Sequence, residues 1–157
     1  METPATVAAR DADIVFEVVA TERPSSAEES ARLQGVALSQ LLRSIVVRRG
    51  EDDYLFVLVP GGRNIDWPKL RAVLGVKRLS LPDEHEAREA TGYERGAITP
   101  FGSSSPWPVI VDRSAAQEDR IAIGGGARGV NLHMSSADLV RATGATVADV
   151  SRAARLD

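Results

Sequence analysis

Short apolar runs separated by glycine, proline and charged residues make up most of the chain, and they predict a series of β-strands. The β-branched run at 14–19 predicts one strand. Two longer runs, at 41–48 and 53–59, flank a polar turn and predict a hairpin. Similar composition predicts further short strands at 76–79, 109–112, 120–123 and 129–134.

Helix signals stand between these strands. A capping serine or aspartate, an apolar repeat and a closing glycine predict helices at 24–34, 66–74 and 135–142. A shorter helix is expected at 82–90, and the segment at 3–12 indicates a frayed helix within an N-terminal extension over 1–13. Because helices alternate with strands and hairpins stand among them, the predicted class is mixed α/β, a mixed sheet with flanking helices.

Length and composition narrow the classes of protein. A chain of 157 residues is expected to form one domain over 1–157. It has no cysteine, which excludes a disulfide scaffold and a thiolate nucleophile, and its two histidines leave little material for a metal site. These counts argue against a metal site built on thiolates or on several histidines. Since no signal peptide and no membrane-length apolar run is found, the expected location is the cytoplasm.

The net charge of −3 hides a basic middle third. The basic residues between 41 and 80 are Arg43, Arg48, Arg49, Arg63, Lys69, Arg71, Lys77 and Arg78. A local basic patch on an acidic protein can bind a polyanion. Solvated strand ends and helix faces are the simpler explanation of the same charges, because such clusters are common on protein surfaces.

Chemistry-bearing motifs are few. There is no P-loop, no GxSxG and no HExxH, and the glycines at 124–129 precede a strand where a dinucleotide fingerprint needs a helix. Arg43 interrupts an apolar strand, so its guanidinium is directed either to solvent or into a polar pocket. The irregular segment at 91–108 is long enough to indicate a functional loop. His85 and His133 are interpreted as structural or solvent-facing.

These features together resemble the YbaK / prolyl-tRNA-synthetase-associated family of aminoacyl-tRNA editing domains. The resemblance spans roughly residues 14–150. It is carried, in order, by Arg43-Ser44, by Gly92-Tyr93 with Gly96–Pro100 and Gly102, by Gly125–Gly129, and by Ser135–Leu139.

The resemblance implies a trans-editing deacylase. Such a protein hydrolyses the ester of a mischarged tRNA, here tRNA for proline or a related tRNA carrying a small wrong amino acid. It implies a curved mixed β-sheet or partial barrel with flanking helices, and catalysis assisted by the substrate or an ordered water. It implies no metal and no organic cofactor. The implied partners are the tRNA acceptor 3′ end and an aminoacyl-tRNA synthetase, with no membrane.

Site residues follow from the same resemblance. Arg43, Gly96 and Asn131 are the expected catalytic positions. The expected substrate-binding positions are Ser44, Ala97, Ile98, Thr99, Pro100, Gly102, Gly124, Gly125 and Gly126. Within this set, 96–100 would wall the amino-acid pocket, and the glycines at 124–126 would offer backbone N–H groups to the ester carbonyl.

The chain departs from the family pattern at three of these positions. The family has lysine where Arg43 stands, an acid where Asn131 stands, and often a serine where Gly124 stands. These changes imply a subgroup with its own amino-acid specificity. They also leave two alternatives open: an inactive module that binds tRNA or a synthetase, and a binder of a free amino acid or nucleotide.

Overall fold

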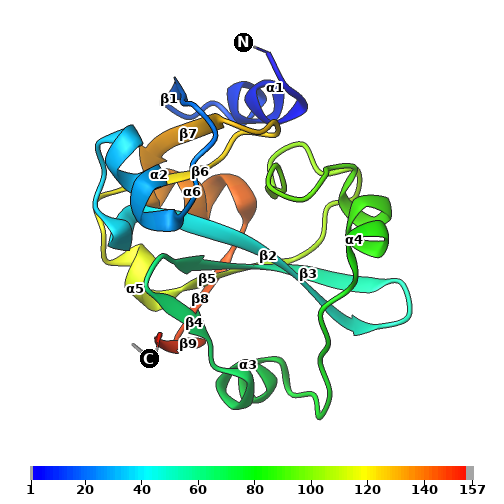
Figure 1. Cartoon of the computed structure of the whole chain (residues 1–157). Coiled ribbons are helices and arrows are strands. Elements are labelled where there is room, and N and C mark those ends of the chain that lie inside the picture. Colours follow the sequence, from blue (N-terminus) through cyan, green and yellow to red (C-terminus); the bar gives the residue numbers. More distant parts are fainter. Residues whose placement is uncertain (1, 155–157) are drawn as a thin grey trace.

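A computed structural model describes residues 2–154 (Figure 1). Its helices are α1 (Pro4–Asp11), α2 (Ala27–Gln34), the 3-10 turn η1 (Leu38–Gln40), α3 (Trp67–Leu74), α4 (Glu84–Thr91), α5 (Arg113–Ala116) and α6 (Ser136–Thr143). Its strands are β1 (Phe16–Ala20), β2 (Leu42–Gly50), β3 (Asp53–Pro60), β4 (Arg63–Ile65), β5 (Val109–Asp112), β6 (Arg120–Gly124), β7 (Val130–Ser135), β8 (Thr146–Ala148) and β9 (Ser151–Ala153).

Strand β3 is buried on both faces, which explains its uninterrupted apolar sequence. Alternate side chains enter two different hydrophobic clusters, with Tyr54, Phe56 and Leu58 on one face and Leu55, Val57 and Val59 on the other. The strand pairs antiparallel with β2, as the hairpin pattern predicts, and parallel with β5. This four-stranded sheet, ordered β2-β3-β5-β8, forms the centre of the molecule.

Two smaller sheets complete the architecture. Strands β1, β7 and β6 form an antiparallel sheet in the order β1-β7-β6, and β4 pairs with β9. A single parallel bridge between Leu41 and Ala122 connects the first of these to the start of β2. The mixed α/β class is therefore confirmed. Within residues 2–154 the sheets remain separate and no closed barrel forms, so "partial barrel" describes them only loosely.

Several predicted helix ends are confirmed by their caps. Ser26, Asp66 and Ser135 each accept a hydrogen bond from a backbone N–H of the first turn, which satisfies a donor that the helix leaves free. Gly35 ends α2 in the left-handed conformation at φ 70°, a conformation that glycine adopts without strain.

The expectation of a frayed N-terminal helix is wrong. The Thr3 side chain caps α1 by accepting from the Thr6 N–H, and the Thr3 hydroxyl donates to the Gly125 carbonyl oxygen at 2.6 Å. Ala5 and Ala9 are fully buried in the main hydrophobic cluster. Small side chains let the helix lie close to the sheet, so it is part of the core and not an appendage.

The strand expected at 76–79 is also wrong. The segment makes only one bridge, between Arg48 and Ser80, and its Lys77 and Arg78 side chains are exposed. In contrast, β4, β8, β9 and α5 lie in segments for which the sequence predicted no element.

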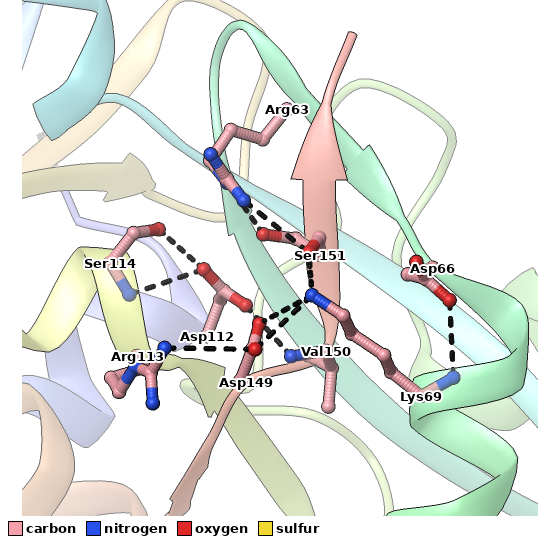
Figure 2. A network of polar contacts seen from close by, with 9 residues as sticks. All are labelled: Arg63, Asp66, Lys69, Asp112, Arg113, Ser114, Asp149, Val150 and Ser151. Atoms are coloured by element: carbon pink, nitrogen blue, oxygen red, sulfur yellow. Dashed lines mark hydrogen bonds and ion pairs between the residues drawn. The ribbon is translucent and has the colours of Figure 1, made fainter.

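A polar network fastens these short elements together (Figure 2). Asp112, fully buried, accepts from the Ser114 N–H and hydroxyl and from the Val150 N–H. Lys69 Nζ lies 3.1 Å from Asp149 and also donates to the Ser151 carbonyl oxygen. Thus β8, β9, α3 and α5 are joined by side-chain bonds where the strands themselves are only three residues long.

No helix among residues 2–154 is long and apolar enough to span a bilayer.

Candidate functional site

A cleft of about 460 Å³ opens between the N-terminal end of α2, the start of β2, and the facing ends of β6 and β7. Its lining residues are Pro24, Ser25, Ser26, Ala27, Ser30, Leu41, Leu42, Arg43, Ser44, Arg95, Gly96, Ile98, Gly124 and Asn131. Segments more than 100 residues apart in the chain therefore meet here, because β7 returns beside β6 and α2 packs over the start of β2.

Half of the predicted site residues lie in this one cleft. Arg43 and Ser44 come from β2, Gly96 and Ile98 from the long loop, and Gly124 pairs with Asn131 across the β6–β7 ladder. The three positions expected to be catalytic, which the sequence separates widely, thus share a cavity. Their roles in catalysis stay predictions.

The Arg43 guanidinium is held at the edge of the cleft. It donates to the main-chain carbonyl oxygen of Arg63, whose own Nε lies 2.6 Å from the Ser151 hydroxyl oxygen. Partial burial lowers the pKa of Arg43 from its ordinary value, and arginine stays protonated at neutral pH after such a shift. The Arg43 cation therefore borders the cavity while it is bonded to Arg63, whose contact with Ser151 is drawn in Figure 2.

Asn131 stands opposite, on the outer face of β7. Its amide nitrogen donates to the Val19 carbonyl oxygen at 3.2 Å, which leaves the side-chain oxygen as an acceptor and one N–H as a donor. An asparagine at this position offers polar contacts to a ligand without adding a negative charge.

Two serine hydroxyls in the cleft are poised for a ligand. The Ser44 hydroxyl oxygen is buried and has no hydrogen-bond partner among residues 2–154, which is a costly state for a polar atom. The Ser30 oxygen accepts from the Gln34 side-chain nitrogen at 2.9 Å, and the Gln34 oxygen lies 2.9 Å from His133 Nε2. With its oxygen engaged in this way, Ser30 can donate its own proton into the cleft.

The histidine at the end of this chain is buried enough to remain neutral. Desolvation is the largest influence on His133 and lowers its pKa below 6.5, while Glu17 acts in the opposite direction. A neutral ring that carries its proton on Nε2 donates to the Gln34 oxygen, which fixes the direction of every bond in the chain. The interpretation of His133 as structural fits this contact, and His85 is exposed on α4.

The cleft holds no conventional acid or base. Among the described residues that line it, none is aspartate, glutamate, histidine, lysine or cysteine. Two guanidinium groups, several hydroxyls, one amide and main-chain groups remain. Such a set can bind and polarise an ester carbonyl and orient a water molecule, while proton transfer must come from the water or from the substrate.

The other predicted site residues do not line the cleft. Ala97 and Thr99 are buried in the loop, where the Thr99 hydroxyl accepts from a neighbouring N–H. Pro100 and Gly102 line a separate hollow of about 220 Å³ beside α1 and α6. These residues shape the loop that carries Gly96 and Ile98.

The three glycines of the turn at 124–126 also differ in whether they line the cleft. Gly124 lines the cleft, but the Gly125 N–H already donates to the Val130 carbonyl oxygen at 2.8 Å. A side chain on Gly126 would meet Thr3 and Tyr93, so this glycine faces α1. The expected backbone donor at 125 is therefore committed to the hairpin, and neither Gly125 nor Gly126 lines the cavity.

Sequence reasoning missed the helix that walls one side of the cleft. Ser25, Ser26 and Ser30 were interpreted only as capping or small helix residues, yet all three line the cavity. Ser25 precedes α2, Ser26 is its N-cap and Ser30 lies four residues after the cap, so three hydroxyls close to one helix start were the available signal.

The basic middle third separates in space. Arg43 borders the cleft, while Arg63 and Lys69 belong to the network of Figure 2. The remaining residues, Arg48, Arg49, Arg71, Lys77 and Arg78, line another hollow of about 560 Å³ at the far end of the β2–β3 hairpin. Charge clustering in the sequence thus corresponds to three different surroundings.

Comparison with known proteins places the chain among editing domains. The family model described as the aminoacyl-tRNA editing domain matches residues 21–142. The EbsC protein of Enterococcus faecalis, a proposed Cys-tRNA(Pro)/Cys-tRNA(Cys) deacylase, is 23% identical over 87% of this chain and 83% of its own length. The proline–tRNA ligase of Xanthomonas axonopodis pv. citri is 32% identical over 73% of this chain. The match covers only 20% of that ligase.

Solved structures agree with this placement. The crystal structure of a proposed trans-editing enzyme for prolyl-tRNA synthetase superposes with a TM-score of 0.86 at 26% identity, covering 97% of this chain and 99% of the other. A signal-transduction protein from Marinobacter aquaeolei, at 19% identity and a TM-score of 0.70, shares the fold. Because the family model covers most of the chain, including both sides of the cleft, this protein belongs to the aminoacyl-tRNA editing domain family, whose members hydrolyse the ester bond of mischarged tRNA.

Proposed function

We propose that this protein removes a small wrong amino acid from tRNA for proline, or from a related tRNA, and that the ester is hydrolysed in the cleft between α2 and β7. The observation that carries the proposal is the convergence of Arg43, Gly96 and Asn131 on one cavity. The relatives named as Cys-tRNA(Pro) deacylase and proline–tRNA ligase support the choice of tRNA.

The lining suggests how the residues divide the work. The terminal adenosine enters with its ester carbonyl toward donors, namely the Arg43 guanidinium and the Ser30 hydroxyl. The buried and unpartnered Ser44 hydroxyl supplies a further contact to the bound nucleotide or to water. Donors fixed in advance stabilise the negative charge that develops on the carbonyl oxygen when water attacks.

The hydrolysis itself balances without a protein base. A water oxygen bonds to the carbonyl carbon, and the bond from that carbon to the ribose oxygen breaks. The ribose oxygen receives a proton and becomes a hydroxyl, and the amino acid leaves as a free acid. Since the described lining has no carboxylate or imidazole, a group of the substrate relays this proton.

Apolar side chains set which amino acid fits. Leu41, Leu42 and Ile98 line the same cavity as the polar groups, so a small side chain is accepted against them and a larger one is excluded by size. One methylene changes selectivity in such a pocket by only about 1–3 kcal/mol. The protein is therefore expected to act on several small amino acids at different rates.

A deacylation assay tests the proposal. Wild type, Arg43→Ala and Arg152→Ala are compared on a panel of tRNAs mischarged with small amino acids. Arg152 is an exposed arginine on β9 that does not line the cleft, so its loss controls for charge. We expect Arg43→Ala to lower kcat/KM by about 100-fold, the usual effect of removing one donor to a developing oxyanion, and Arg152→Ala to have little effect.

Two other experimental outcomes would favour the alternative functions, a tRNA-binding module or a small-molecule binder. Tight binding of tRNA with no hydrolysis of any mischarged species identifies a binding module that has lost activity. Stabilisation by a free amino acid or by adenosine, without any hydrolysis or tRNA binding, identifies a small-molecule binder, because a ligand raises the stability of the state that binds it. An unchanged rate in Arg43→Ala refutes the role given to that guanidinium.

A further inference from the structure

A second hollow opens beside the cleft and is lined by three arginines. Arg23, Arg95 and Arg128 surround a volume of about 280 Å³ together with Pro24, Gly96 and Gly129. We call this site the arginine hollow. Pro24, Arg95 and Gly96 also line the cleft, so the two cavities adjoin at these residues.

The three arginines come from three separate loops. Arg23 precedes α2, Arg95 lies in the long loop after α4, and Arg128 lies in the glycine turn between β6 and β7. All three lie outside the basic stretch at 41–80, so charge counting along the sequence does not reveal this cluster. The fold itself brings the three cations together.

Their charges are available to a ligand. All three side chains are exposed, and within residues 2–154 neither Arg23 nor Arg128 takes part in an ion pair. Arg95 lies 2.8 Å from Glu84, but both side chains are more than two-thirds exposed. Exposed pairs of this kind are worth about 0–1 kcal/mol, so a phosphate can displace the carboxylate at little cost.

Gly96, which has no side chain, lies at the junction between the two cavities. Gly96 has φ 88°, and a Cβ atom there would lie 3.6 Å from Arg128 Nε. The Arg128 side chain thus lies across Gly96, at the opening from one cavity into the other. A chain-like ligand can pass this point with its backbone close to the guanidinium.

We propose that the arginine hollow binds phosphates of the single-stranded 3′ end that leads the terminal aminoacyl-adenosine into the cleft. The inference rests on the proposed function, since the cleft must hold that adenosine. Guanidinium groups match phosphate oxygens with two parallel donors. An unpaired strand that enters the cleft past Gly96 places its next phosphates among the three arginines.

The hollow at the hairpin end is the rival surface. It is larger and lined by Arg71, Lys77 and Arg78, but it shares no lining residue with the cleft. Along β2, the six residue-to-residue steps from Arg43 to Arg49 correspond to about 20 Å. The hairpin end lies on the side of the molecule away from α2 (Figure 1). A short strand seated in the cleft does not extend to it.

Two charge-matched variants distinguish the surfaces. One carries Arg23→Gln and Arg128→Gln; the other carries Arg71→Gln and Lys77→Gln. Arg95 is left in place because it also lines the cleft. Each variant is assayed on 3′-aminoacyl-adenosine, which has no phosphodiester, and on a short aminoacylated oligonucleotide ending in CCA. We expect the first variant to lose about fivefold in kcat/KM on the oligonucleotide only, as the loss of two exposed ion pairs implies. The second is expected to stay near wild type on both.

Salt dependence gives an independent readout. Binding of a CCA oligonucleotide that carries no amino acid is measured by fluorescence anisotropy from low to high salt. Two lost phosphate contacts on a single strand reduce the slope of log K against log salt by about 1.4. An unchanged slope and rate in the first variant, or an equal fall in the second, overturns the inference. If wild type hydrolyses no ester at all, the proposed function fails, and the anisotropy series still decides whether these arginines bind the strand.

Discussion

Replacing Asp112 by alanine tests how the polar network supports both the fold and Arg43. The carboxylate is 1% exposed and accepts from three donors, the Ser114 N–H, the Ser114 hydroxyl and the Val150 N–H. Val150 is fully buried, so its N–H at 3.0 Å has no water to replace the lost oxygen. Through β9 the effect reaches Ser151, which holds Arg63 and thereby Arg43.

The size of the effect follows from these contacts. Each buried donor left without a partner costs about 1–3 kcal/mol. With the Val150 N–H stranded and the Ser114 contacts weakened, we expect Asp112→Ala to lower the free energy of unfolding by about 3 kcal/mol. In a domain of about 150 residues each kcal/mol shifts Tm by about 2–4 °C, so the expected fall in Tm is about 6–12 °C.

The assay is urea unfolding of wild type, Asp112→Ala and Asp66→Ala between neutral and acid pH. Asp66 is the matched control, an aspartate that caps α3 through one N–H and whose loss costs about 1 kcal/mol. Burial, the largest influence, raises the pKa of Asp112, but hydrogen bonds from Ser114, Val150 and Ser151 together bring it below 3.8. A depressed pKa stabilises the fold above the unfolded value and loses this contribution as pH falls through the folded one.

The difference between wild type and Asp112→Ala is therefore expected to be constant near neutral pH and to shrink below about pH 4. A loss at pH 7 no larger than that of Asp66→Ala contradicts the assignment of Asp112 as the centre of the network. The assignment is also contradicted if the stability difference between wild type and Asp112→Ala stays the same as the carboxylate is protonated.

Three other predictions follow from single contacts. Thr3→Ala removes the α1 cap and the bond to the glycine turn, and is expected to lower stability by about 1–2 kcal/mol in urea unfolding, whereas a frayed helix predicts no change. Gly102→Ala is expected to lower Tm far more than Gly35→Ala. Both glycines have φ near 70°, but only a Cβ atom at position 102 would lie 2.5 Å from a main-chain oxygen. An equal fall in Tm for the two variants contradicts this. Gln34→Glu makes the Ser30 hydroxyl donate to the new carboxylate and not into the cleft. The kcat/KM for deacylation is therefore expected to fall about 3- to 10-fold, and Ser30→Ala is expected to have the same effect. An undiminished rate in both variants shows that Ser30 does not contact the ester.

Local signals predicted most of the elements but not the short ones. Caps at Ser26, Asp66 and Ser135 are read from a few neighbouring residues, and the sequence identified each of them. Strands β4, β8 and β9 are three residues long and are held by partners far along the chain, so their own composition carries little signal. Tertiary contacts also explain α1, whose alanines become core residues only against the sheet.

The candidate site was predictable where main-chain motifs marked it. Arg43, Gly96 and Asn131 were named from their motifs, and they share the cleft. Ser30 was not, because nothing in the sequence shows that Gln34 and His133 set the direction of its hydroxyl. The orientation of Gly125 was equally hidden, since its N–H is committed to the hairpin only once β6 and β7 pair.

A crystal structure with a non-hydrolysable amide analogue of 3′-aminoacyl-adenosine tests the central claim most directly. The account predicts the analogue between α2 and β7, with its carbonyl oxygen near Arg43 and Ser30 and its adenosine reaching past Gly96. An analogue bound in the hairpin hollow of Arg71 and its neighbours, or a cleft left empty at saturating analogue, contradicts it.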